Sequence, residues 1–146
     1  MAISLYDLSI STYLQILRSL SGVLEKGAVY AGENNLDLDE IVETQLRPDM
    51  LPFRFQVISV WHHSLGAIKG LREGTFSPPP SLEPDYAGLQ DLVTEAIEGL
   101  EMVTRQELEA LEGRPMKFVT KNVEIPFTTE NFILSFSLPN FYFHAT

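Results

Sequence analysis

The sequence lacks cysteine altogether, so none of its 146 residues carries a thiol. A chain without thiols cannot build a disulfide framework, a thiolate zinc site, an iron–sulfur cluster or a cysteine nucleophile. Because a cysteine-free chain is compatible with a reducing compartment, we expect a cytoplasmic protein.

Positive charge is also scarce. The 10 Lys and Arg residues stand against 20 Asp and Glu, which gives a formal net charge of −10. Nucleic-acid binding needs clustered Lys and Arg, and anionic membrane surfaces attract the same residues. We therefore expect an acidic protein that has neither nucleic acid nor a membrane as its partner.

Long apolar segments are missing as well. The longest stretch without a charged residue covers residues 131–146. It is shorter than the roughly 18 apolar residues that a membrane-spanning helix needs, and it also contains Asn, Ser and Pro. The N-terminal segment has no basic region, and Asp7 interrupts its start, so no secretory signal is predicted. The 45% hydrophobic content supports a packed core, and the length indicates one domain over residues 1–146.

The first predicted helix begins at a capping box. Ser4 and Asp7 have the spacing of such a box, in which a side-chain oxygen accepts from a free backbone N–H. Apolar residues then follow at alternating steps of three and four, which is typical of a helix in a bundle. These residues are Ile3, Tyr6, Ile10, Tyr13, Leu17, Leu20 and Leu24. Gly27 predicts the end of the helix.

Similar spacing predicts two further helices. The second begins near Asp49, with Pro52 in its first turn, where the missing N–H costs nothing. A Pro-rich stretch over residues 74–84 then forms an extended connection. The third helix is expected from Asp85 to Glu112, with one apolar face and one acidic face.

In the last part of the chain the spacing of the apolar residues changes from a helical to an alternating pattern. Residues 116–127 alternate around Lys121-Asn122, which predicts a short β-hairpin. The fourth helix is expected to start at Thr128, and Pro139 should kink it or break its hydrogen-bond ladder. The sequence thus predicts an all-α four-helix bundle with a hairpin before the last helix. Its long connections allow an up-down-down-up order of the helices.

Three histidines are the main candidates for chemistry: His62, His63 and His144. Helical bundles can hold metals on inward-facing His and carboxylate side chains, and neutral imidazole is a common ligand. His62 is preferred as a metal ligand and as a pocket residue because its helical line is more apolar. The alternative for each histidine is a satisfied core residue.

The last helix also carries a line of polar residues. Ser137, Asn140 and His144 follow steps of three and four and so share one face. If that face points inward, His144 is a candidate general acid or base, oriented by Asn140. Trp61 and Tyr142 are either core residues or walls of an apolar ligand pocket that includes Ser137.

Three motifs carry a resemblance to a known family. They are Ser4-Leu5-Tyr6-Asp7, then Leu46-x-Pro48-Asp49-Met50-x-Pro52 leading into Gln56-Val57, and finally Leu138-Pro139-Asn140-Phe141-Tyr142-Phe143-His144. Over essentially its whole length the chain resembles the uncharacterised domain-of-unknown-function family DUF1993. That family is similar in fold to the DinB/YfiT-like metalloenzymes, which are up-down-down-up four-helix bundles. The resemblance implies this fold and brings no established reaction with it.

The resemblance also has consequences for a metal site. DinB-like proteins place one metal ligand on the second helix and a pair of histidines four residues apart late on the fourth. His62 matches the first ligand, whereas the late pair has no counterpart before Thr146. The resemblance therefore implies a short fourth helix, and the apolar surface left uncovered favours a homodimer.

These observations lead to three expectations of function. The first is the binding of a small, partly apolar molecule in an interior pocket near His62, Asn140, Tyr142 and His144, with binding alone and binding followed by transformation left as alternatives. The second is a metal-dependent DinB-type transferase or hydrolase, which would use a divalent transition metal such as zinc or nickel. The third is a non-catalytic, dimeric interaction module.

Overall fold

The computed structural model describes residues 3–146 and is mostly helical, with one small sheet. Four long helices carry the fold, and three of them contain a π-helical turn, labelled η. They comprise η1 (Asp7–Ser11) with α1 (Thr12–Glu33), α3 (Phe53–Trp61) with η2 (His62–Gly66) and α4 (Ala67–Glu73), α5 (Tyr86–Glu101), and α7 (Thr129–Phe132) with η3 (Ile133–Ser137) and α8 (Leu138–Ala145). The remaining elements are α2 (Leu38–Val42), α6 (Arg105–Glu109), β1 (Thr75–Phe76), β2 (Pro115–Val119) and β3 (Glu124–Thr128).

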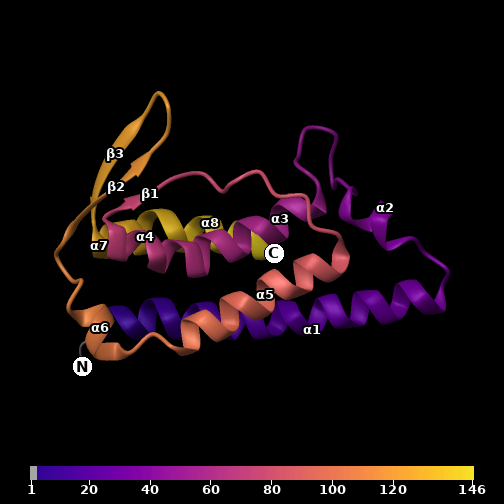
Figure 1. Cartoon of the computed structure of the whole chain (residues 1–146), viewed down its shortest axis with the longest axis horizontal. Helices are drawn as coiled ribbons and strands as arrows, with labels where there is room; N and C mark the ends of the chain where they lie inside the picture. Colours follow the sequence, from indigo (N-terminus) through magenta and orange to yellow (C-terminus); the bar gives the residue numbers. More distant parts are fainter. Residues whose placement is uncertain (1–2) are drawn as a thin grey trace.

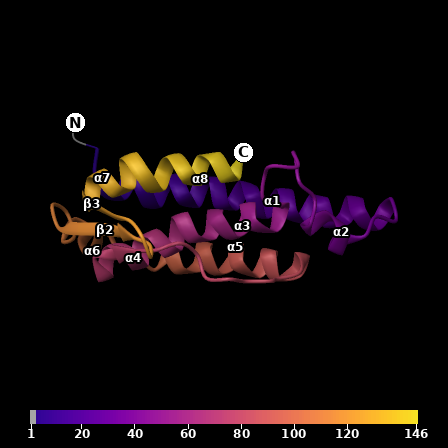
Figure 2. The same ribbon diagram turned by 90° about the horizontal axis from the view of Figure 1, so that it is seen from above.

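The long helices lie side by side along one axis. In Figure 1, α1 runs away from the N-terminal end, whereas α3–α4 and α5 run back towards it and α8 runs away again. Contacts join α1 to α5, α3 to α5 and α3 to α8, and Figure 2 shows α8 lying along α1. The small sheet and α6 gather at the end of the molecule where α4 stops (Figures 1 and 2). No helix among residues 3–146 is both long and apolar enough to cross a membrane.

The first helix is longer than predicted. It continues through Gly27 to Glu33, so the prediction that Gly27 ends it is wrong. The glycine has another role, because a Cβ atom there would lie 2.5 Å from the Tyr86 hydroxyl. That hydroxyl donates a 2.8 Å hydrogen bond to the Leu24 carbonyl and so ties α5 to α1. Gly27 therefore allows two helices to approach closely.

Boundaries of the second and third helices also differ from the prediction. The second begins at Phe53 rather than Asp49, with Pro52 in an extended conformation before it. The third begins as expected, where the Asp85 side chain accepts from the Gly88 N–H at 2.8 Å. It ends at Glu101 rather than Glu112, and α6 begins separately after its own threonine cap.

The predicted hairpin is confirmed, and it belongs to a larger sheet. Strands β2 and β3 are antiparallel, with Phe118 opposite Ile125. Strand β1 adds to the other edge of β2 in parallel, with Thr75 opposite Lys117. Gly74, in the left-handed conformation at φ 75°, ends α4 and turns the chain into β1. This strand was not predicted.

Helix four starts where the sequence indicated. The Thr128 side chain caps it by accepting from the Asn131 N–H, and Phe127 packs edge-on against Phe132 at 5.7 Å between ring centroids. Pro139 does not end the helix. Instead the hydrogen-bond register widens to the π-turn η3 directly before it and then returns to α-helix in α8. A π-turn of this kind is a known way to accommodate a break in the α-helical ladder.

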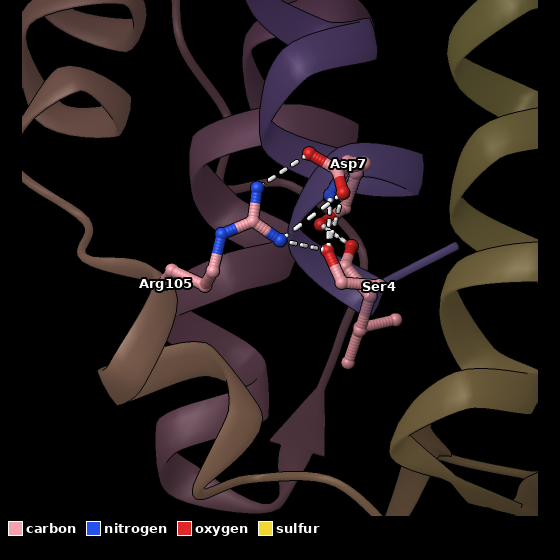
Figure 3. A network of polar contacts seen from close by, with 5 residues as sticks. Ser4, Asp7 and Arg105 are labelled. Atoms are coloured by element: carbon pink, nitrogen blue, oxygen red, sulfur yellow. Dashed lines mark hydrogen bonds and ion pairs between the residues drawn. The ribbon is translucent and has the colours of Figure 1, made fainter. Parts of the chain in front are cut away.

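A polar clamp fixes the beginning of the first helix (Figure 3). The Asp7 N–H donates to Ser4 Oγ at 3.1 Å, which confirms the predicted cap, and Ser4 Oγ donates to the Asp7 carboxylate at 2.7 Å. Arg105, from α6, donates to both Asp7 oxygens and to Ser4, and its guanidinium lies 4.9 Å from the Tyr6 ring centroid. The hydrogen bonds from Arg105, with a smaller one from Ser4, lower the pKa of Asp7 to about 2. The clamp therefore holds α6 against the beginning of the first helix.

Candidate functional site

A buried chain of hydrogen bonds joins three of the long helices. Ser137 Oγ donates to the His63 carbonyl at 2.5 Å. Because that bond uses the serine hydrogen, the Tyr13 hydroxyl 2.7 Å away must donate to Ser137 Oγ. Ser137 and Tyr13 are fully buried, and burial raises the pKa of Tyr13. Ser137 was expected in a ligand pocket, but the structure uses its hydroxyl to connect the π-turns η2 and η3.

His63, rather than His62, faces the interior. Its side chain is buried, and its ring lies parallel to that of His144 with 6.0 Å between centroids. Its Nδ1 atom has no hydrogen-bond partner among the described residues. Burial, together with the neighbouring imidazoles of His62 and His144, lowers the pKa of His63 to about 3. His63 is therefore a neutral imidazole inside the protein at neutral pH.

His62 points towards the Pro-rich segment instead, although its ring centroid is only 5.9 Å from that of His63. Its Nε2 atom is 2.6 Å from the Ser77 carbonyl, to which it donates, and its ring stacks on Phe76 at 4.4 Å between centroids. Together with Trp61 it lines a shallow hollow of about 300 Å³ beneath the Pro-rich segment. His62 and Trp61 therefore line a different hollow from the one that His144 lines. The reason is that residues 75–80 pack against the helix and cover this face.

The residues present do not fit the metal site that the fold family implies. Within residues 3–146, no three His, Asp or Glu side chains lie close enough together to hold one metal ion. Nε2 of His62, the predicted ligand, is already bonded to a backbone carbonyl. We therefore assign no chemical step to a metal ion.

A larger cavity of about 470 Å³ opens beside the C-terminal end of α8. It lies between α1, the segment around α2, helix α3 and the end of α8. Its lining is mainly apolar and includes no charged side chain. The residues are Leu20, Val23, Ile41, Thr44, Leu46, Met50, Leu51, Phe53, Gln56, Val57, Val60, His144, Ala145 and Thr146.

Two polar side chains meet at this cavity. His144 Nδ1 lies 2.7 Å from Gln56 Oε1, and Gln56 Nε2 donates to the Leu51 carbonyl at 2.9 Å. His144 is half-buried, and burial lowers its pKa. The ring of Phe55 stands edge-on to the His144 ring at 5.9 Å between centroids. The imidazole is thus held in place by a glutamine that itself is anchored to the backbone.

The partner predicted for His144 was a different residue. Asn140 donates from its amide to the Phe136 carbonyl of its own helix at 2.7 Å, and it does not contact the His144 imidazole through a hydrogen bond. Tyr142 is 44% exposed and lines a separate hollow of about 200 Å³ against α1. Of the predicted site residues, only His144 lines the large cavity. The sequence reasoning missed Gln56 and Met50, although both stand in the second motif that carries the family resemblance.

Comparisons with known proteins agree with this fold. A family model described as "Domain of unknown function (DUF1993)" matches residues 5–146. The chain is similar to a solved structure of a DinB family member protein from Shewanella denitrificans, with a TM-score of 0.79 and 20% sequence identity. That similarity covers 97% of this chain and 80% of the other. The comparison with curated proteins gave no match. At 20% identity the structural similarity is evidence of a shared fold alone.

Proposed function

The chain belongs to the DUF1993 family, and from that premise we propose that it is a small-molecule-binding protein built as a DinB-like, up-down-down-up helical bundle. The ligand is a small, partly apolar molecule, and its site is the cavity beside Gln56 and His144. The family match also confirms the resemblance that the sequence motifs carried.

One observation supports this proposal above the others. The cavity of about 470 Å³ combines an apolar lining with two polar side chains held at one place by hydrogen bonds. Ligand sites in proteins are usually concave, mostly apolar and between about 300 and 1,000 Å³, with a few fixed polar groups that orient the ligand. Both the size and the arrangement match that description.

If the bound molecule is transformed, His144 is the group that moves the proton. It is the titratable side chain among the residues that line the cavity. Its lowered pKa keeps the imidazole neutral near pH 7, as a general base requires. Gln56, rather than Asn140, orients the ring for that role.

A blocked cavity tests the proposal. Val23 lies at the rim and is 61% exposed, so Val23→Trp adds bulk to the cavity without burying it in the core. Val29, on the same helix and 57% exposed, lies away from the cavity, and Val29→Trp is the matched control. Binding is followed by methyl NMR of Met50 during titration with a set of small neutral alcohols, ethers and hydrocarbons.

We expect the Met50 methyl signal to shift with at least one probe in the wild type and in Val29→Trp. In Val23→Trp the shift should be lost. If no probe moves this signal in the wild type, or if both tryptophan variants bind equally well, the proposed site is wrong.

A second candidate function, pairing of two copies, is favoured by a different observation. Val23, Leu46 and Tyr142 are all exposed around the C-terminal end of α8. In a chain of net charge −10, residues 131–146 carry no charged side chain. Two copies can meet there without bringing carboxylates together. Light scattering decides this, since the mass of a single chain at high concentration contradicts a homodimer.

A further inference from the structure

The hydrogen bonds around Gln56 determine the orientation of its amide group. The Leu51 carbonyl can only accept, so the group that faces it at 2.9 Å must be the amide NH₂. The amide oxygen then faces His144. An amide oxygen also can only accept, and therefore Nδ1 of His144, 2.7 Å away, must carry the hydrogen of this contact.

This arrangement leaves a free lone pair on the other ring nitrogen. A neutral imidazole carries one N–H, so Nε2 of His144 is an acceptor whenever Nδ1 is the donor. Among residues 3–146, Nε2 has no hydrogen-bond partner, and it is absent from the polar atoms that are buried and unpaired. Nε2 is therefore accessible to solvent or to a ligand.

The lining of the cavity disfavours anionic ligands. No Lys or Arg side chain lines the cavity, so a carboxylate would find no countercharge there. A carboxylate would in addition place its negative charge against the nitrogen lone pair. A neutral hydroxyl group, by contrast, offers one hydrogen to one acceptor and needs no counterion.

On the basis of the proposed function, we propose that the cavity selects neutral alcohols and phenols: the apolar body fills the space beside Met50 and Val57, and the hydroxyl donates to His144 Nε2. One neutral hydrogen bond changes affinity by about threefold to tenfold. That is the expected preference for an alcohol over a ligand of the same shape that cannot donate.

Three probes with one skeleton test this selectivity. They are cyclohexylmethanol, its methyl ether and cyclohexanecarboxylate, each titrated at pH 7.5 with the Met50 methyl signal as the readout. The alcohol should bind about threefold to tenfold more tightly than the ether, and the carboxylate should bind most weakly. Equal affinities of alcohol and ether would overturn the selectivity and leave the binding site standing, whereas no binding by any probe would overturn both.

A variant pair tests the role of the glutamine. Gln56→Glu places a carboxylate against Nδ1, which favours the doubly protonated imidazole and turns Nε2 into a donor. The preference for alcohol over ether should then fall to about one. Gln15→Glu adds the same charge at an exposed position of α1 that does not line the cavity, and it should keep the wild-type preference.

The protonation of His144 has a readout that does not depend on any ligand. Long-range ¹H–¹⁵N correlation of the wild-type imidazole should show a protonated Nδ1 and an unprotonated Nε2. A protonated Nε2 in the neutral ring would overturn the inference even if all three probes bind.

Discussion

Acid should destabilise this fold through one buried histidine. The pKa of His63 in the folded protein is about 3, against an ordinary value of 6.5, because burial disfavours the charged imidazole and His62 and His144 add to the effect. The unfolded chain therefore takes up the proton first as the pH falls. His63 contributes stability that is fully present above pH 6.5 and that is lost progressively between pH 6.5 and 3.

The size of this effect follows from the difference in pKa. One pKa unit corresponds to about 1.4 kcal/mol, so the full loss by pH 3 amounts to roughly 5 kcal/mol. Between pH 7 and pH 5 the loss is already about 2 kcal/mol, because protonation of the unfolded chain is nearly complete at pH 5. That is a large part of the 5–15 kcal/mol by which a typical domain is stable.

Urea unfolding of the wild type and of His63→Leu at several pH values measures this contribution. Titration of the groups that do not interact with His63 cancels in the difference between the two proteins. The wild type should lose about 2 kcal/mol relative to His63→Leu between pH 7 and pH 5. Leu65→Ala, a substitution at a buried neighbour that does not titrate, should differ from the wild type by the same amount at both pH values. A difference between wild type and His63→Leu that does not change with pH would refute the reasoning.

Two further predictions concern the packing of the first helix and its clamp. Gly27→Ala would force a Cβ against the Tyr86 hydroxyl and break its buried hydrogen bond, at a cost of about 1–3 kcal/mol in the free energy of unfolding. Gly22→Ala, in the same helix with open space around it, should instead stabilise by about 0.5–1 kcal/mol, and equal effects of the two changes in urea unfolding would contradict this account. Arg105→Leu should raise the pKa of the Asp7 carboxyl from about 2 towards 3.8 in an NMR titration. Because the folded pKa is the lower one, the wild-type clamp stabilises above pH 3.8 and loses its effect as the pH falls through 2, and an unchanged Asp7 pKa in the variant would show that Arg105 is not its cause.

Much of the fold could be predicted from local sequence patterns. Ser4, Asp85 and Thr128 cap helices in the structure as their sequence positions indicated. The predicted apolar face of the third helix is buried in the structure, at Tyr86, Leu89, Val93, Ala96 and Leu100. The hairpin around Lys121-Asn122 forms as an antiparallel pair of strands. These features depend on residues within a few positions of one another, which is why sequence spacing alone predicts them.

Other predictions failed where a distant contact decided the outcome. Gly27 resembles a helix end, yet the hydroxyl that explains it comes from Tyr86 on another helix. Strand β1 is only two residues long and forms because β2 lies beside it. His62 and His63 stand in one helical turn, and which of them faces α8 depends on where residues 75–80 pack. No pattern within the second helix contains that information.

The candidate site shows the same division most clearly. The sequence by itself determined an acidic, cysteine-free helical protein with His144 as its candidate for acid–base chemistry. Only the tertiary structure decided that Gln56 holds His144, that Asn140 bonds within its own helix, and that His62 bonds to the Ser77 carbonyl. The physical reason is distance along the chain. Gln56 and His144 are separated by 88 positions, and their contact exists because α3 and α8 pack together.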